Sequence, residues 1–507
     1  MTPLWLGIDV GTTAIKAALY GADGVQVSYG ECASDVATPQ PGQSEQDMDQ
    51  VWQGVCRAVK QAVQSVDVAR IESVGLAAQG DGFWSLDADG RPNGPAILWN
   101  DTRAAANLAE LSAADLAVIA QACHTSLWPG TVGPIYRWLK QNAPERAQNV
   151  AHIMHCAGWV GYCLTGHMAV DFSDASIPFL NLHDGQSHDG RYSDSALAAL
   201  RVSDLKSALL PPQSAQTQLG LISAKAALEC GLPAGLPVSV GTLDLSAMIV
   251  GMGMDQPGDT MMILGTTAVV NILTDSITPD DRPVGATAFH ANGQTLTRIL
   301  APTTGAAAFD WFCALHPQTL GGETPAEIAG KLNALAKDVP AGANGVTFLP
   351  HLNGERAPFV APDATGVFFG LRTTSTKADM GRAVMEGTAF SLRDCYMSEC
   401  GHLPKTTIRL TGGGSKNALW CQIIADVMQI PIEVSGASDH GLWGAACLGA
   451  AANGKGIASQ IAKRTEQSIV YDPTPAHGPA YDAAFATYRT LSTAAQSLWT
   501  QPSKEMQ

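Results

Sequence analysis

The sequence predicts an α/β protein made of two large domains of similar design. Its 507 residues exceed what one hydrophobic core usually supports, which favours two domains. Strand-like segments alternate with amphipathic helical segments along the first half of the chain, as in a sheet with crossover helices. A segment starting at Gly258 then repeats the pattern with which the chain opens. Two halves of similar fold are the simplest interpretation of this repeat.

Composition narrows the class of protein. Apolar residues make up 46% of the chain and charged residues 15%, with a formal net charge of -16. Without clustered Lys and Arg, a nucleic-acid surface is not expected, although backbone N–H groups could still bind the phosphates of a nucleotide. The eleven scattered cysteines lack the spacing of a zinc or redox motif, and neither a signal peptide nor a membrane span is expected. We therefore expect a cytoplasmic protein.

The opening segment, "LGIDVGTTAIKAALYGADG", contains two apolar runs joined by a Gly-Thr-Thr tip. One interpretation is a plain hairpin with a polar turn. The other is an anion site, because glycine permits a tight turn and threonine offers hydroxyl and N–H groups to a phosphate. An aspartate at the strand end could hold a metal ion, usually through water, and a lysine could add charge. The candidate ligands are Asp9, Thr12, Thr13 and Lys16.

The segments that follow continue the alternation. Ser44 fits a helix start, and one apolar face is then formed by Val51, Val55, Val59, Val63 and Val66. Residues 71–90 predict a strand, a polar glycine-rich turn and a second strand. The glycine-rich stretch Gly251–Asp259, which carries Pro257, is the expected hinge between the two halves.

The second half opens on "GDTMMILGTTAVVNILTD", which presents Gly265, Thr266 and Thr267 as a second tip. Two such tips could bind a triphosphate between them. Two matching Gly-Thr-Thr tips are also less expected by chance than one. Further on, "TTIRLTGGGSKNALW" places Gly412 to Gly414 between a strand and a helix. A plain turn explains one glycine, whereas three let a flat ring approach the backbone, and Asn417 could bind a base or ribose.

Asp244 lies in "VSVGTLDLSAM", where a buried strand leads into an apolar helix. One role for it is that of a helix N-cap. The other is that of a base that accepts the proton of a substrate hydroxyl during phosphoryl transfer. The helix dipole would keep the carboxylate ionised, so the two roles are compatible.

Two segments combine amides, carboxylates and aromatic rings, "AAQGDGFW" and "AILWNDTRA". This mixture suits a polyhydroxylated ligand, although ordinary turns also collect Asn, Asp and Gly. The candidate substrate residues are Gln79, Asp81, Trp99, Asn100 and Asp101. Glu355-Arg356, in "FLPHLNGERAPF", is an ion-pair candidate that we expect to serve in a structural loop.

Taken together, these segments resemble the FGGY family of carbohydrate kinases, which belongs to the larger group of actin, hexokinase and Hsp70-type ATPases. The matching segments run in family order: "GIDVGTTAIKAALY", "PGQSEQDMDQVW", "LTGHMAVDFSDAS", "GTLD", "LGTTA", "LPHLNGERAPF", "RAVMEGTAFSLRD" and "TGGGSKNALWCQIIADV". Ordered coverage from residue 6 to about residue 450 is more specific than any single motif.

The resemblance implies two ribonuclease-H-like domains with a catalytic cleft between them. The first, residues 1–250, would bind the sugar, and the second, residues 251–507, would bind ATP. Asp244 matches the catalytic base of the family, and Asp9 would hold Mg²⁺ through water. The nucleotide residues implied by the match are Asp9, Thr12, Thr13, Lys16, Gly265, Thr266, Thr267, Gly305, Gly413, Gly414 and Asn417.

The implied activity is ATP-dependent phosphorylation of a terminal hydroxyl of a small sugar or polyol, with ATP and Mg²⁺ as cofactors. Where the D-xylulose kinases of the family typically carry Gln-Met-His-Gly, this chain has "QGDG", residues 79–82, and Leu245 stands where Asn or Gln is usual. The segments "AAQGDGFW", "SLWPG" with Trp128, and "TLDLSA" look closer to kinases of L-xylulose and erythritol. We expect a xylulose-type ketopentose, preferably the L form, with erythritol or another short polyol as the alternative.

An actin-like or chaperone-like ATPase is the alternative from another class, because it shares both phosphate tips but needs no sugar. A sugar-sensing regulator would require an added DNA-binding segment. The sugar-side segments and the "GERAP" loop favour the kinase. A homodimer is expected from the family, with no nucleic acid or membrane as partner.

Overall fold

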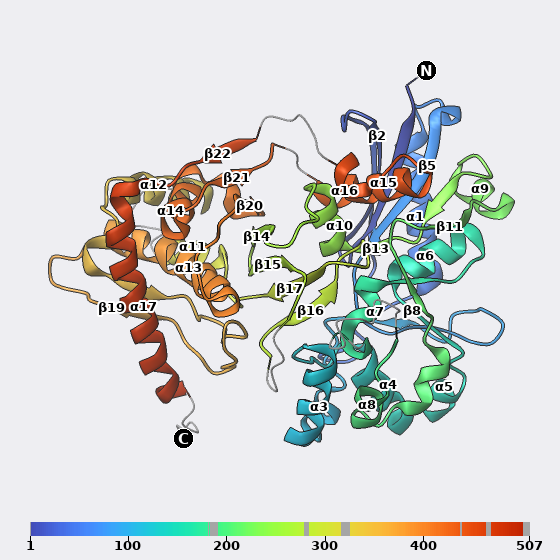
Figure 1. Cartoon of the computed structure of the whole chain (residues 1–507), viewed down its shortest axis with the longest axis horizontal. Coiled ribbons are helices and arrows are strands. Elements are labelled where there is room, and N and C mark those ends of the chain that lie inside the picture. Colours follow the sequence, from blue (N-terminus) through green and yellow to red (C-terminus); the bar gives the residue numbers. More distant parts are fainter. Residues whose placement is uncertain are drawn as a thin grey trace. The chain divides into compact units, whose positions relative to one another are not determined.

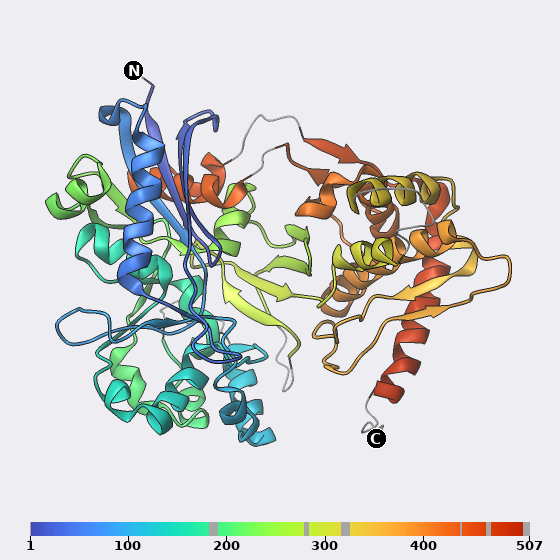
Figure 2. The ribbon, with the colours of Figure 1, turned by 180° about the vertical axis from the view of Figure 1, so that it is seen from behind.

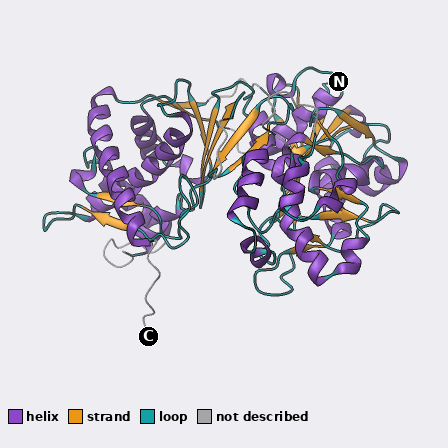
Figure 3. Cartoon of the chain, turned by 60° about the horizontal axis from the view of Figure 1, so that its bottom comes forward, coloured by secondary structure: helices purple, strands orange, loops and turns teal. Residues whose placement is uncertain are grey.

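The computed structural model describes residues 2–180, 182, 191–277, 283–315, 325–436, 439–462 and 468–499. These residues form two compact units, each built of strands and helices (Figures 1 and 3). Unit 1 contains Met1–Pro257, Leu273–Thr297 and Ala437–Thr465, and unit 2 contains Gly258–Ile272, Arg298–Gly436 and Glu466–Gln507. The chain first passes from one unit to the other inside the stretch expected to be a hinge.

The central sheet of unit 1 has the strand order β11-β12-β5-β1-β2-β3. β1 runs antiparallel to β2 and parallel to β5, β3 runs antiparallel to β2, and β12 runs parallel to β5. The strands of the sheet are β1 (Leu4–Val10), β2 (Ala14–Gly21), β3 (Gln26–Ala33), β5 (Ile71–Ala78), β11 (Gln218–Leu221) and β12 (Pro237–Ser239), with β13 (Thr242–Leu243) also pairing with β5.

Helix α1 (Met48–Val63) packs on β2 and β3 and lies in front of the blue strands in Figure 2. Its predicted apolar face is buried at four of the five valines, whereas Val66 lies beyond the end of the helix and is only partly buried. The expected start at Ser44 is wrong. Asp47 is the N-cap, and its carboxylate accepts a hydrogen bond from the amide of Gln50 at 3.0 Å. Aspartate commonly makes this contact at the N-cap position.

Helix α15 (His440–Ala452) comes from far along the chain but belongs to unit 1. Glycines let it lie almost against the backbone of the sheet. A Cβ added at Gly7 would lie 2.1 Å from the carbonyl oxygen of Leu442, and one added at Gly75 would lie 1.7 Å from that of Ala445. No larger residue fits at these points without moving the helix.

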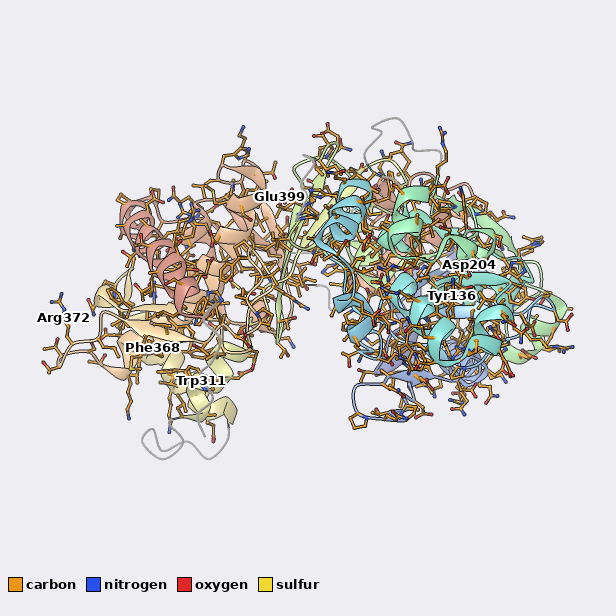
Figure 4. All side chains as sticks on the ribbon, turned by 90° about the horizontal axis from the view of Figure 1, so that it is seen from below. Tyr136, Asp204, Trp311, Phe368, Arg372 and Glu399 are labelled. Atoms are coloured by element: carbon orange, nitrogen blue, oxygen red, sulfur yellow. The ribbon has the colours of Figure 1, made fainter. Side chains whose placement is uncertain are left out.

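The rest of unit 1 is largely helical. In one helical cluster the Tyr136 hydroxyl donates to Asp204 at 3.1 Å, and Lys140 lies 2.8 Å from the same carboxylate (Figure 4). The helices are η1 (Val68–Arg70), α2 (Ala105–Ala109), α3 (Ala113–Cys123), α4 (Val132–Asn142), α5 (Pro144–Gln148), α6 (Cys156–Thr165), α7 (Phe172–Phe179), α8 (Asp194–Ala199), η2 (Ser203–Ala208), α9 (Ala224–Cys230), α10 (Asp244–Gly251) and α16 (Ala458–Ile461). The short strands are β4 (Glu45–Gln46), β6 (Trp84–Leu86), β7 (Ala96–Ile97), β8 (His152–Met154), β9 (Val170–Asp171), β10 (Pro212–Gln213) and β16 (Ala286–Phe289).

The sheet of unit 2 repeats the topology of unit 1. Its strands run in the order β17-β15-β14-β20-β21-β22, with β14 antiparallel to β15 and parallel to β20. The strands β14, β15, β20 and β21 therefore correspond to β1, β2, β5 and β12, and the predicted repeat is confirmed. The strands of this unit are β14 (Thr260–Leu264), β15 (Ala268–Thr274), β17 (Leu296–Leu300), β18 (Thr347–Leu349), β19 (Val367–Phe369), β20 (Ile408–Thr411), β21 (Ile432–Val434) and β22 (Ile469–Tyr471).

Unit 2 contains an aromatic cluster formed by α11 (Ala307–Ala314), β18 and β19. The ring of Phe348 stacks 6.0 Å from that of Trp311 and lies 4.6 Å from that of Phe368. Trp311 and Phe368 are labelled in Figure 4. The helices are α11 (Ala307–Ala314), α12 (Pro325–Lys337), η3 (Ala343–Gly345), α13 (Lys377–Cys400), η4 (Gly413–Lys416), α14 (Ala418–Met428), η5 (Pro475–His477) and α17 (Gly478–Trp499). Among the described residues of both units, none of the helices has the length and apolar character needed to cross a membrane.

Candidate active site

The first expected phosphate tip lies at the turn between β1 and β2. Asp9 pairs with Lys16 across the hairpin, and the amide of Gly11 donates to the carbonyl of Ala14 at 3.0 Å. Thr13 is exposed and Thr12 is partly exposed. The segment is thus a hairpin whose tip presents hydroxyl groups to solvent, as both interpretations of the sequence required.

Asp439, which the sequence did not single out, lies beside this hairpin. Its carboxylate caps α15 by accepting the amide of Leu442 at 3.1 Å, and its other oxygen lies 3.4 Å from Nζ of Lys16. Burial raises the pKa of Asp9 to about 7, the charges of Asp244 and Asp439 add to the rise, and Lys16 opposes it. An Asp immediately before a helix of small and apolar residues is an N-cap signal, and it could have identified this position.

Asp244 is the first residue of α10, where the helix leaves β13. Its own oxygen accepts the amide of Leu245 at 2.6 Å, which satisfies one N–H group of the first helical turn. The expected N-cap role is nevertheless wrong, because Leu243 is the N-cap of α10 and no side chain caps this helix. Burial in the surrounding protein raises its pKa to about 6, and the Leu245 amide opposes this rise. Asp244 is surrounded by protein atoms but still has surface in contact with solvent, so water screens part of this rise in pKa. Asp244 is then mostly ionised at neutral pH and open to a ligand.

Gln79 and Asp81 follow the carboxyl end of β5. Gln79 is buried and donates to Oε1 of Gln46 at 2.6 Å, while its own oxygen has no partner among the described residues. Asp81 adopts the left-handed conformation, with φ of 56°. Burial raises its pKa to about 7, with a further contribution from the charge of Asp244. That contribution places the carboxyl of Asp81 in the electrostatic field of the expected base.

The remaining substrate candidates form a second group. Nε1 of Trp128 donates to the carbonyl of Trp99 at 3.1 Å, and both Trp99 and Asn100 are exposed. Asp101 is buried, and its oxygens accept the amide of Ser44 at 2.7 Å together with the guanidinium of Arg103 at 2.8 and 2.9 Å. Asp101 thus holds the loop together with protein donors, whereas the two tryptophans and Asn100 remain accessible to a ligand.

The second tip, Gly265–Thr267, lies between β14 and β15 in unit 2. Gly305 supports it from behind: its amide donates to the carbonyl of Thr266 at 2.9 Å. A Cβ at Gly305 would lie 2.5 Å from the carbonyl oxygens of Gly265 and Thr267. Thr266 and Thr267 are exposed, so this turn is a close counterpart of the first tip.

The glycine triplet follows β20, beside this second tip. Gly412 has φ of 96°, and a Cβ at Gly414 would lie 2.5 Å from the side chain of Leu264, whereas a Cβ at Gly413 would meet no atom within 4 Å. Asn417 caps α14 by accepting the amide of Trp420 at 3.2 Å. Close packing therefore accounts for two of the glycines, and Gly413 alone faces open space.

The structure brings most of the predicted residues together in one set in each unit, while Trp99, Asn100, Asp101 and Trp128 form a separate group in unit 1. In unit 1, the charge of Asp244 raises the pKa of both Asp9 and Asp81. In unit 2, the second tip, Gly305 and the glycine triplet adjoin. Two buried residues missed by sequence reasoning, His155 and Asp174, lie next to Asp81. The signals that could have found them are a His between a strand and a helix and the second Asp of "DFSDAS".

The loop "GERAP" is structural in the way the sequence predicts, but its contacts differ from the expected ion pair. The carboxylate of Glu355 accepts the amides of Thr303 and Arg356, both at 2.9 Å, and its other oxygen lies 2.7 Å from Nδ1 of His351. The guanidinium of Arg356 donates instead to the carbonyl of Ala301 at 2.7 Å. Glu355 therefore binds backbone amides and a histidine at a buried loop.

Known proteins resemble this chain over almost all of its length. It is 29% identical over 501 residues to a probable L-xylulose kinase of Pasteurella multocida, and the alignment covers 97% of this chain and 99% of the relative. It is 30% identical to the xylulose kinase of Escherichia coli, covering 92% of each chain. It is 28% identical to the erythritol kinase of Brucella abortus, covering 97% and 96%.

Structural comparison gives the same family. The crystal structure of a xyloylose kinase from Brucella ovis superposes with a TM-score of 0.86 at 28% identity, covering 98% of this chain and 100% of that one. The expected fold of two actin- or hexokinase-like domains is thereby confirmed. Residues 4–251 match the N-terminal domain of the FGGY family of carbohydrate kinases, and residues 260–453 match its C-terminal domain. The chain therefore belongs to the FGGY family and is a carbohydrate kinase.

Proposed function

We propose that this kinase transfers the γ-phosphate of ATP to a terminal hydroxyl of a xylulose-type ketopentose, with L-xylulose as the preferred acceptor. The observation that carries the proposal is the accessible carboxylate of Asp244 at the start of α10, with the carboxyl of Asp81 in its field. An ionised carboxylate can accept a hydroxyl proton while it orients that hydroxyl toward a phosphate. FGGY kinases are ATP-dependent, so the phosphate donor follows from the family.

Asp244 is proposed as the catalytic base. Its place in the first turn of α10 lets the helix dipole favour the ionised form, and the amide of Leu245 at 2.6 Å holds one carboxylate oxygen. The other oxygen is then available to take the proton of the acceptor. The acceptor would be oriented by Asp81 and Gln79, beside Trp99, Asn100 and Trp128, with Asp101 holding their loop in place.

The nucleotide is assigned to the tips and the glycine triplet. Thr12, Thr13 and Lys16 would contact phosphate oxygens on unit 1, while the exposed Thr266 and Thr267 would do so on unit 2. Gly413 faces open space, which suits the approach of adenosine, and Asn417 would bind the base or ribose. Transfer then requires the acceptor and the γ-phosphate to be brought in line.

Mg²⁺ is proposed to bind near Asp9 through water. The Asp9 oxygen Oδ1 has no hydrogen-bond partner among the described residues, and carboxylate oxygen is the donor that Mg²⁺ prefers. Within the described residues, no group of three or more His, Cys, Asp or Glu is arranged to hold a metal ion. That agrees with the usual mode of Mg²⁺, which takes few protein ligands and several oxygens from phosphate and water. The ion would supply charge to the transferring phosphate.

The choice of acceptor rests on residues 79–82 and on the named relatives. Kinases of L-xylulose, xylulose and erythritol are similar to this chain to almost the same degree. Asp81 offers a carboxyl where the D-xylulose kinases of the family typically carry histidine, and this favours L-xylulose or, as the second candidate, erythritol. A coupled assay over D-xylulose, L-xylulose, D-ribulose, L-ribulose, glycerol and erythritol tests the choice. The highest kcat/KM on D-xylulose would contradict it.

The same assay tests the class of activity. ATP turnover that is indifferent to every acceptor would contradict the proposed transfer to a ketopentose or short polyol and favour an ATPase of the actin or chaperone type. The expected cytoplasmic location agrees with the eleven cysteines, all described and all thiols. The homodimer stays a prediction, which light scattering of the purified protein tests.

A further inference from the structure

The turn that carries Asp81 is strained. Asp81 and Gly82 both have positive φ, 56° and 74°. Glycine adopts this conformation freely, but an L-residue such as aspartate does so at a cost of about 1 kcal/mol unless its surroundings hold it there. The surroundings of Asp81 must therefore stabilise this turn.

Two buried side chains from other elements lie against the turn that carries Asp81. Nδ1 of His155, the residue before α6, lies 3.4 Å from the carbonyl oxygen of Asp81. Asp174 in α7 lies against the residue before Asp81, because a Cβ at Gly80 would lie 3.1 Å from its Oδ1, an oxygen with no hydrogen-bond partner among the described residues. Burial, together with the charges of Asp171, Asp81 and Asp244, raises the pKa of Asp174 well above its usual value. One buried side chain thus lies at the carbonyl of Asp81, and the other lies against the backbone of Gly80 just before it.

His155 and Asp174 are themselves fixed in place. Their side chains are 5% and 2% exposed, and Nδ1 of His155 lies 3.9 Å from Oδ1 of Asp174. Burial lowers the pKa of His155 to about 4, so the ring is neutral, and its Nδ1 must carry the hydrogen that the Asp81 carbonyl accepts. The amide of Asp174 is bound in turn by the carboxylate of Asp171, the N-cap of α7, at 3.2 Å.

We propose that His155 and Asp174 are positioning residues that hold Asp81 in its left-handed conformation, so that its carboxyl faces the acceptor beside Asp244 and selects a polyhydroxylated substrate. This inference rests on the proposed function, because it gives Asp81 an acceptor to select. His155 and Asp174 act only through the backbone of the turn, His155 at the Asp81 carbonyl and Asp174 against Gly80. Their loss should weaken binding of the acceptor and leave the nucleotide unaffected.

The first test replaces His155 while keeping its packing. His155→Phe removes the Nδ1 donor and keeps an aromatic ring beside the small cavity lined by Val132, Ile153 and Phe179. His155→Asn is the conservative control, because its amide places a donor where Nδ1 lies. We expect His155→Phe to raise the KM of the best acceptor about tenfold, with kcat and the KM of ATP nearly unchanged, and His155→Asn to restore it.

A double-mutant cycle with Asp81 separates positioning from general damage. Asp81→Gly removes the carboxyl and adopts the left-handed conformation without strain. In that background, His155→Phe has no carboxyl left to position, so its effect on acceptor KM should disappear. The same tenfold loss in both backgrounds would overturn the inference. Asp174→Ala is the second variant, with the same expected pattern, should His155→Phe fail to fold.

A readout that needs no acceptor keeps this inference distinct from the proposed function. Hydrogen exchange at the amides of residues 80–83 should accelerate in His155→Phe and return to the parent rate in His155→Asn. Unchanged exchange in a folded His155→Phe protein would overturn the positioning role. If exchange changes while no tested sugar or polyol is phosphorylated, the positioning role stands, the selection of an acceptor is refuted for those compounds, and the proposed substrate class fails.

Discussion

Nζ of Lys16 and Oδ2 of Asp439 lie 3.4 Å apart, although 423 positions separate the two residues in the sequence. Lys16 belongs to the strand that leaves the first tip, and Asp439 caps α15. The contact therefore joins the expected phosphate tip to a helix supplied by the far end of the chain. Both side chains are partly exposed, 33% and 22%, so the ion pair itself should add little stability.

Substitutions at Asp439 should separate its two roles. Asp439→Asn keeps an N-cap and removes the charge, so the free energy of unfolding should stay within about 0.5 kcal/mol of the parent. Asp439→Ala removes the cap as well and should cost about 1 kcal/mol more, measured by urea unfolding. Both should raise the KM of ATP through Lys16, while the KM of the acceptor stays unchanged. Equal destabilisation by the two substitutions would mean that the cap is not the stabilising contact.

Asp244→Asn should remove phosphoryl transfer and leave the fold intact. The neutral amide cannot take the acceptor proton, so kcat should fall by about 10²- to 10⁴-fold. It also relieves repulsion with Asp9 and Asp81, whose pKa values the charge of Asp244 raises, so the melting temperature should not fall. Asp89→Asn makes the same chemical change at an exposed turn and is the matched control. Activity within a few-fold of the parent would remove Asp244 from the role of base.

Asp81 should make stability depend on pH in a definite direction. Its pKa is about 7 in the folded protein, chiefly through burial, against about 3.9 in an unfolded chain. Between these values the native state keeps a proton that the unfolded state releases, so this contribution to stability is lost as pH rises from about 4 through 7. Asp81→Asn removes the effect. Its melting temperature relative to the parent should therefore be higher at pH 8 than at pH 5, and an offset independent of pH would contradict the raised pKa.

Much of the fold could be predicted because local pattern and topology agree. Each half opens with two apolar runs around a Gly-Thr-Thr tip, and each forms a β1–β2 or β14–β15 hairpin at the centre of its sheet. The sequence does not reveal which distant segments pack against each sheet. The glycines at 7 and 75 look like weak points of strands, and only the structure shows that they admit α15 at van der Waals distance.

Of the candidate site, the residues at strand ends could be predicted, whereas the neighbours that packing brings to them could not. Asp244 and both tips stand at strand ends, where polar residues in an apolar context are conspicuous. The environment of Asp81 was not predictable, because His155 and Asp174 come from separate elements, and their proximity depends on how α6 and α7 pack. Asp101 looked like a ligand for the same reason that it is a good loop anchor: a carboxylate in a turn serves either purpose, and its partners decide.

The glycine triplet offers a matched pair of substitutions for the nucleotide site. A Cβ at Gly413 would meet no protein atom within 4 Å, so Gly413→Ala should fold as the parent does, yet the methyl group would stand where adenosine is proposed to approach. Gly414→Ala would place its Cβ 2.5 Å from Leu264 and should cost about 1–3 kcal/mol of stability through overpacking. We expect Gly413→Ala to raise the KM of ATP with the melting temperature and the acceptor KM unchanged, whereas Gly414→Ala should lower the melting temperature. An unchanged KM for ATP in Gly413→Ala would show that the open space beside this residue does not receive the nucleotide.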